Sequence, residues 1–173
     1  VECYNPFADE WQQSASLPIA VSVPSVIGLR GRLYAIGGAT EDECACGRVQ
    51  SYDPVLDTWR LLPGPEFCRK TLRVAAAADG RVFVLGGRRP RELSEVSVET
   101  GEELAHEPSG QQRTFPGVVA AGDRLWVLGG KVGEESRSCA ERYDPLTRSW
   151  TTLAGFLPKA LYMHGCVTIQ DES

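Results

Sequence analysis

The stretch Leu125-Trp126-Val127-Leu128-Gly129-Gly130 sets four large apolar residues directly before two glycines. A short apolar run of this kind is typical of a strand that is covered on both faces. Glycine has no side chain to pack and loses the most backbone freedom on folding, so a glycine pair is a costly way to end a strand. We therefore expect the backbone at this pair to need a positive φ or a close approach that a β-carbon would block.

The same phrase occurs three times along the chain. It reads LYAIGG ending at Gly38, VFVLGG ending at Gly87 and LWVLGG ending at Gly130, so the pairs are 49 and 43 residues apart. A second phrase, Tyr-Asp-Pro or Tyr-Asn-Pro, is followed by a tryptophan seven residues after its tyrosine. These tryptophans are Trp11, Trp59 and Trp150. Phrases that recur at a period of roughly 40 to 50 residues indicate a repeat protein.

Each repeat is predicted to form four short strands. The first is small and apolar, as at residues 75–78 and 118–121, and the second ends in the glycine pair. The third ends in Tyr-Asp-Pro, where the Asx-Pro step opens a turn, and the fourth begins at or just before the tryptophan. Helical periodicity is not sustained over about ten residues anywhere, so the fold class is all-β.

A four-stranded sheet that is apolar on both faces needs a neighbour on each side. Small residues on the first strand indicate where crowding is greatest, which favours blades arranged around a central channel. In that arrangement the tyrosines and tryptophans fill the wider outer gaps. We therefore expect Trp59 and Trp150 to be largely buried between blades, and the glycine pairs to lie close to the crowded centre.

The glycine pair after an apolar strand, then Tyr-Asp-Pro, then tryptophan, resembles the kelch repeat of β-propellers over essentially the whole chain. The resemblance is to kelch domains of the BTB-kelch or kelch-domain-containing type. Two repeats match in full, at residues 30–63 and 123–153. The middle repeat departs from the pattern, because Val98 stands where the tyrosine is expected and no tryptophan follows. Its outer strand is the least well defined by the sequence.

The resemblance implies a kelch-type β-propeller segment of four-stranded antiparallel blades. Its expected parts are residues 1–17 (the last two strands of a blade), 18–63 (a full kelch repeat), 64–108 (a degenerate kelch repeat), 109–157 (a full kelch repeat) and 158–173 (the first strand of a further repeat). Kelch-like propellers commonly have six blades, so we expect part of a six-bladed ring. The rest of a longer chain, or another chain, would complete the ring. A four-bladed ring closed by the leftover strands is the alternative.

Kelch domains of the ubiquitin-ligase adaptor type bind short peptide segments with loops around the channel mouth. These loops join the fourth strand to the next first strand and the second strand to the third. The basic residues predicted in them are Arg69, Lys70, Arg73, Arg88, Arg89, Arg91 and Arg113, and Tyr162 is a candidate aromatic contact. On a chain of net charge −5 a local positive rim favours an acidic or phosphorylated partner. The alternative is an ordinary solvated surface, and Tyr162 is equally compatible with core packing.

The resemblance therefore implies a protein-interaction module without enzymatic activity. Its most specific form is the substrate-recognition domain of a ubiquitin-ligase adaptor, which binds a short acidic or phosphorylated segment at the channel mouth. The ligase role comes from the family alone, because the chain contains no BTB domain. The alternative is a cytoskeletal or scaffolding kelch protein that binds actin-like partners.

An enzyme is the competing class, because propellers also host oxidases and hydrolases. The only two histidines, His106 and His164, lie in different repeats and cannot supply a histidine-rich copper or zinc site. The chain has no G-x-S-x-G elbow and no phosphate loop, so we expect no cofactor and no metal. A negative net charge disfavours nucleic acid, and no apolar run approaches the roughly 20 residues of a membrane span. We expect a cytoplasmic protein.

Six cysteines, at positions 3, 44, 46, 68, 139 and 166, do not recur at equivalent places in the repeats. A disulfide framework would follow the repeat, so we interpret them as reduced thiols. The close pair Cys44 and Cys46 has one intervening residue, which matches the spacing of structural zinc sites poorly. A metal or redox role of this pair is the alternative to two loop cysteines.

Overall fold

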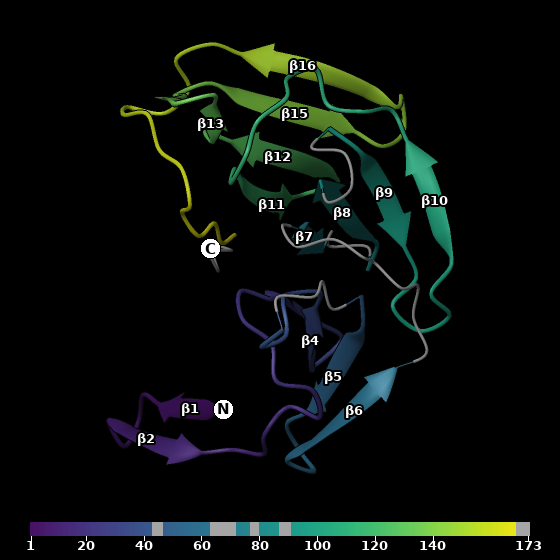
Figure 1. Cartoon of the computed structure of the whole chain (residues 1–173), viewed down its shortest axis with the longest axis vertical. Helices are drawn as coiled ribbons and strands as arrows, with labels where there is room; N and C mark the ends of the chain where they lie inside the picture. The colour runs from purple at the N-terminus through teal and green to yellow at the C-terminus, as the bar shows by residue number, and fades with distance from the viewer. Residues whose placement is uncertain (43–46, 63–71, 77–79, 87–90, 169–173) are drawn as a thin grey trace.

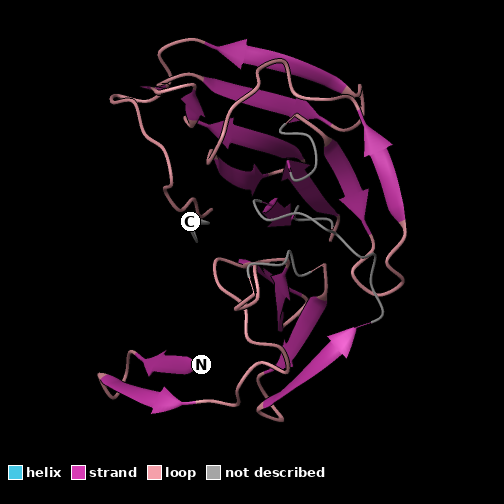
Figure 2. Cartoon of the chain, viewed as in Figure 1, coloured by secondary structure: helices cyan, strands magenta, loops and turns pink. Residues whose placement is uncertain are grey.

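Strands and loops make up the part of the chain that the computed structural model describes, namely residues 1–42, 47–62, 72–76, 80–86 and 91–168. These residues contain no helix, as the repeat pattern predicted (Figure 2). Three four-stranded antiparallel sheets follow one another along the chain, and we call them the first, second and third blades (Figure 1). A two-stranded hairpin precedes them, and a short two-stranded ribbon projects from the third blade.

The strands run in chain order from the innermost to the outermost in each blade. The hairpin contains β1 (Glu2–Asn5) and β2 (Glu10–Gln13). The first blade contains β3 (Ser25–Leu29), β4 (Arg32–Ile36), β5 (Val49–Asp53) and β6 (Thr58–Leu62). The second contains β7 (Leu72–Ala76), β8 (Val82–Gly86), β9 (Leu93–Val96) and β10 (Glu103–His106). The third contains β11 (Gly117–Ala121), β12 (Arg124–Leu128), β15 (Ala140–Asp144) and β16 (Ser149–Leu153), and its ribbon is β13 (Lys131–Val132) with β14 (Glu135–Ser136).

The core lies between the blades rather than within one sheet. One apolar cluster joins the first and second blades: Ile27, Tyr34, Ile36, Val49, Val82, Val84, Val96 and Val98. The other joins the second and third blades: Phe83, Leu85, Leu93, Leu125, Val127 and Tyr143. The innermost strands β3, β7 and β11 lie next to one another at the centre (Figure 1). This is the radial arrangement of a β-propeller, and it confirms the fold expected from the repeat.

The two glycine pairs that are described in full, Gly37-Gly38 and Gly129-Gly130, meet both requirements that the sequence suggested. Gly38 has a φ of 102° and Gly130 a φ of 91°, in the left-handed region that favours glycine. A β-carbon on Gly38 would lie 2.7 Å from the carbonyl oxygen of Ser22, and one on Gly129 would lie 2.4 Å from that of Leu161. Gly38 and Gly130 therefore let the loop that enters the first strand of their own blade pass over the end of the second strand, and Gly129 does the same for the segment after the third blade.

The register of the second blade corrects one expectation. In the third blade, Tyr143 pairs with Leu125 of the second strand. Val82 of the second blade is equivalent to Leu125, and it pairs with Val96. Val98, expected at the tyrosine position, follows the end of β9 and is buried against the first blade. The loop between β8 and β9 is shorter than its counterparts, so the spacing of the other repeats does not give the register of β9.

The described part of residues 158–173 contains no strand, although it was expected to be the first strand of a further repeat. Met163 donates its N–H to the carbonyl of Phe115 at 2.9 Å, and Leu161 forms an isolated bridge with Arg137. Met163 has a φ of 54°, close to the 51° of Phe115 and of Val23, the residues at the same place before β11 and β3. The segment thus enters as a first strand does, and its described residues are not paired with any of the described strands in a ladder.

Each tryptophan of a complete repeat ties its blade to the preceding unit. The Nε1 of Trp59 donates to the carbonyl of Ala15 at 3.0 Å, and the Nε1 of Trp150 donates to that of Glu107 at 2.8 Å. The ring of Trp150 also stacks on Tyr143, with centroids 4.9 Å apart. Both indoles are half-buried rather than largely buried, because the outermost strand lies where the gap between blades opens to solvent.

A polar contact replaces part of the apolar packing between the second and third blades. In the first blade, Asp57 accepts a hydrogen bond from the hydroxyl of Tyr52. In the third blade, Arg148 occupies the position equivalent to Asp57. The Tyr143 hydroxyl instead bonds to Nδ1 of His106 at 2.7 Å, while Nε2 of His106 lies 3.2 Å from Glu95. Burial lowers the pKa of His106 below 6.5, an effect that Glu95 partly offsets.

The tryptophan tie predicts an outcome for stability. We expect Trp150→Ala to lower the free energy of unfolding by about 2–4 kcal/mol, since it removes a half-buried indole and leaves a gap between two blades. Trp150→Phe keeps a ring and removes only the N–H donor, so its loss should be about 1 kcal/mol. Chemical denaturation measures both, and a parent-like Trp150→Ala variant would contradict the assigned contact.

The buried histidine predicts a pH dependence. A lowered folded-state pKa means that the unfolded chain binds the proton more tightly, so stability is fully present above pH 6.5 and falls as the pH drops through the folded-state value. His106→Leu introduces the residue type found at the equivalent positions Leu62 and Leu153. Denaturation between about pH 5 and 7 should show a smaller loss in this variant than in the parent. Equal slopes would contradict the contribution of His106.

Candidate partner-binding rim

Two kinds of loop meet at one edge of each blade and form what we call the rim. Its described segments are residues 14–24, 37–42, 47–48, 91–92, 107–116, 129–139 and 154–165. In the second blade, Ser109 donates its N–H to the carbonyl of Arg91 at 2.9 Å, and in the third, Leu157 donates to Ser138 at 2.8 Å. These equivalent bonds hold the loop that leaves one blade against the loop that precedes its third strand.

Three of the eight predicted contact residues have described side chains. Arg69, Lys70, Arg88 and Arg89 lie outside the described residues, and Arg73 belongs to β7, whose side chains are likewise outside the described part. Arg91, Arg113 and Tyr162 remain, and the structure places them in three different environments.

Arg91 is exposed on the rim, as expected. Its Nε donates to the carbonyl of Ser109 at 2.6 Å, and no other hydrogen bond of this guanidinium lies among the described residues. The side chain borders a hollow of about 470 Å³ that is lined by Glu92, by strands of the second blade and by the loop that leaves this blade. His106, Pro108 and Gln112 line the same hollow.

Arg113 is buried, which differs from the expectation of an exposed rim cation. Its Nη2 lies 2.9 Å from Glu141, and the two side chains are only 1% and 0% exposed. Its Nη1 donates to the carbonyl of Gly129 at 2.9 Å, and Nη2 also donates to Oε1 of Gln111 at 3.0 Å. A charge inside the protein needs such partners, so Arg113 anchors the loop at residues 109–116 and does not reach a binding partner itself.

Tyr162 lies at the surface with 45% of its area exposed. The ammonium of Lys131 is 4.8 Å from the centre of its ring, within the range of a cation–π contact. Lys131 also lies 3.2 Å from Glu134. The structure therefore brings Tyr162 together with a cation of the β12–β15 loop that the sequence reasoning did not single out.

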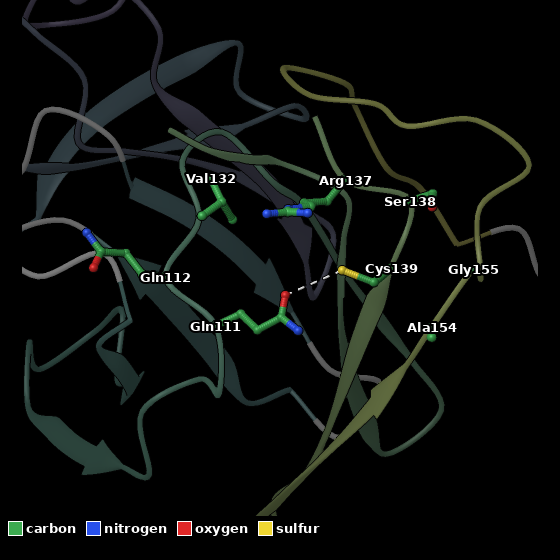
Figure 3. A pocket seen from close by; sticks show the side chains of 8 residues that line it. All are labelled: Gln111, Gln112, Val132, Arg137, Ser138, Cys139, Ala154 and Gly155. Atoms are coloured by element: carbon green, nitrogen blue, oxygen red, sulfur yellow. Dashed lines mark hydrogen bonds between the residues drawn. The ribbon is translucent and has the colours of Figure 1, made fainter. Parts of the chain in front are cut away.

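A second hollow, of about 550 Å³, occupies the equivalent place in the third blade (Figure 3). Its lining residues are Gln111, Gln112, Val132, Arg137, Ser138, Cys139, Ala154 and Gly155. Gln112 borders both hollows, so they are neighbours along the rim. Sequence reasoning missed Gln111 and Arg137, and the only signal for them was their position in rim loops.

Acidic residues accompany the described cations of the rim. Arg137 lies 3.2 Å from Glu135, and Lys131 is paired with Glu134 on the same loop. Both acids are exposed, and exposed pairs of this kind contribute little to stability. The described rim therefore carries both signs, while the basic cluster expected at Arg88 and Arg89 lies outside it.

The described part of the chain contains neither a candidate metal site nor a candidate membrane-spanning helix. There, no group of three or more His, Cys, Asp or Glu side chains could hold a metal ion. Cys3, Cys139 and Cys166 are free thiols, and Cys44, Cys46 and Cys68 lie outside the described residues. Nor do the described residues form any helix with the length and apolar character that a bilayer span requires.

A family model and individual known proteins match this chain, and all of these matches are kelch proteins. The model of the Kelch motif matches residues 24–66 and 112–156. Kelch-like protein 35 of Mus musculus is 33% identical over 98% of this chain, and Kelch-like protein 38 of Homo sapiens is 26% identical over the same share. The chain spans only 29% and 30% of the length of these two relatives.

A solved structure supports the same fold. YjhT superposes with a TM-score of 0.70 over 84% of this chain and 55% of YjhT, at 16% sequence identity. At that identity the likeness concerns the fold alone. The repeated glycine pair, the blades that it helps to assemble and the matched Kelch motifs together show that this chain is a kelch-type β-propeller segment and belongs to the kelch-repeat family.

Proposed function

We propose that this chain is part of the substrate-recognition domain of a BTB-kelch ubiquitin-ligase adaptor, and that its rim binds a short acidic or phosphorylated segment of a protein. The kelch-like relatives support a protein-interaction module. The adaptor role and the acidic partner go further and rest on the family resemblance and on the basic residues of the rim loops. We propose no catalytic activity.

The observation that carries the proposal is the repetition of one hollow in successive blades. The two hollows of about 470 and 550 Å³ lie on either side of Gln112. Each is bounded by the segment before the third strand and by the loop that leaves the blade. A peptide that follows the rim can therefore occupy both, in the way that repeat proteins read extended ligands along stacked units. Arg91 at the first hollow supplies a donor for an acidic group.

We also propose that the propeller is completed by the rest of a longer chain or by another chain, as a ring of six blades. Support comes from the free face of the first blade. There Leu33 is 39% exposed, whereas its equivalent Leu125 is 1% exposed against the second blade. An apolar face of this type needs a further blade to cover it. A cytoplasmic location is part of the same proposal.

The second candidate is a scaffolding kelch protein that binds actin-like partners through the same rim. The mixed charge of the described rim suits this function as well as the first. The proteins recovered with the full-length protein from a cell lysate separate the two: cullin and its accessory subunits support an adaptor, and filament proteins support a scaffold.

We expect the triple charge reversal Arg88→Glu, Arg89→Glu and Arg91→Glu in the full-length protein to abolish recovery of an acidic partner. Binding of this partner to the parent protein should also weaken with added salt, because exposed charges are screened beyond about 8–10 Å at physiological ionic strength. Affinity purification followed by mass spectrometry measures recovery, and circular dichroism verifies the fold. Arg60→Glu, an exposed change on the outermost strand of the first blade, is the control. Undiminished recovery by the triple variant would contradict the basic rim.

A further inference from the structure

The side chains that line the hollow of the third blade carry a positive charge and no negative charge. Arg137 enters it from one side and Gln111 from another (Figure 3). Arg137 is the only charged residue among the described lining residues, and none of them is acidic. The apolar part of the wall comes from Val132 and Ala154.

The backbone carbonyls along one wall are already occupied. The carbonyl of Arg137 accepts from the N–H of Leu161 at 3.2 Å, and that of Ser138 accepts from Leu157 at 2.8 Å. The carbonyl of Cys139 accepts from Gly129 at 3.0 Å. A ligand therefore meets a wall whose backbone acceptors are engaged in holding adjacent rim segments together.

The hydrogen bonds of Gln111 engage its amide oxygen and leave its amide N–H groups to donate to a ligand. Its Oε1 accepts from Nη2 of Arg113 at 3.0 Å and from the thiol of Cys139 at 3.4 Å (Figure 3). Rotating the amide by half a turn would set its N–H groups against the guanidinium N–H of Arg113, so the network selects one orientation. Arg113 is itself held by the buried carboxylate of Glu141. Arg113 and Glu141 are therefore positioning residues for the Gln111 amide.

Arg137 can change partners at small cost. Its Nη2 lies 3.2 Å from Glu135, but the two side chains are 40% and 75% exposed. Exposed pairs of this kind are weak and compete with solvent. A carboxylate that enters the hollow can take the place of Glu135 and meet the guanidinium in the two-point geometry that arginine favours.

From these contacts we infer that the hollow between Gln111 and Arg137 is a carboxylate-binding site, in which both side chains donate hydrogen bonds to one carboxylate of the bound partner. The inference rests on the proposed function of the rim and deepens it by naming the group that is bound and the residues that bind it. Val132 and Ala154 provide the contact for the methylene groups that carry the carboxylate. The carboxylate belongs either to an acidic side chain or to a chain terminus.

The test uses the full-length protein and three libraries of short peptides. The first is acetylated and amidated at its ends with a fixed central Glu, and the second is identical with Gln in place of Glu. The third has no acidic side chain and a free C-terminus. We expect the Glu library or the free C-terminal library to bind about tenfold more tightly than the Gln library, since hydrogen bonds to a charged group are worth about that factor. Which of the two is preferred identifies the source of the carboxylate.

Gln111→Glu is the decisive variant. It keeps an oxygen acceptor for Arg113, so the loop stays anchored, but it replaces the donor in the hollow with a negative charge. We expect it to remove the carboxylate preference, and we expect Arg137→Gln to reduce that preference about fivefold. The control is Gln12→Glu, which makes the same chemical change at an exposed side chain of β2 that lines neither hollow. It should change the preference less than about threefold.

A parent protein without carboxylate preference, or a preference that survives both Gln111→Glu and Arg137→Gln, would overturn the inference. Failure of the proposed function is seen separately, in the recovery of lysate partners by the variants of Arg88, Arg89 and Arg91. If that recovery depends on the arginines while Gln111→Glu still prefers carboxylates, the rim function stands and the carboxylate site does not. Unfolding curves of each variant verify that the comparison concerns folded protein.

Discussion

Face-to-face packing of the blades is the interaction on which the rest of the structure depends. Each sheet presents apolar side chains on both faces, so its stability comes from its neighbours rather than from its own ladder. The clusters around Val49 and Val84, and around Leu93 and Val127, are the two interfaces that meet this need. The glycine pairs and the tryptophan N–H groups serve the same packing. The former let connecting loops pass close to the strands, and the latter tie the outermost strand to the preceding unit.

The second blade shows how this packing tolerates a degenerate repeat. Val96 replaces the expected tyrosine and packs against the first blade, so that interface keeps its apolar character. On the other side, His106 stands at a position where the other blades have leucine, and it supplies a partner for the hydroxyl of Tyr143. Arg148, at the place of the acceptor Asp57, bonds instead to the carbonyl of Ala105 at 2.7 Å. Changes at separate positions thus compensate one another across one interface.

The rim draws its geometry from the same interfaces. The buried pair of Arg113 and Glu141 fixes the loop that leaves the second blade, and this loop in turn presents Gln111 and Gln112 to the two hollows. Bonds from Ser109 to Arg91 and from Leu157 to Ser138 repeat the arrangement from one blade to the next. The loop at residues 109–116 is therefore firmly held, because moving it would expose a buried ion pair.

The sequence by itself determined the repeat, the all-β class and the four-stranded blade, since a strand that ends in Gly-Gly and a Tyr-Asp-Pro turn are local requirements of the backbone. It also located the rim loops and the exposed Arg91. Only the tertiary structure decided the register of β9, because loop lengths differ between repeats. It alone buried Arg113 and opened the hollow beside Gln111 and Arg137. These features depend on a carboxylate, carbonyls and side chains from separate segments of the chain, and no spacing within one repeat encodes such a meeting.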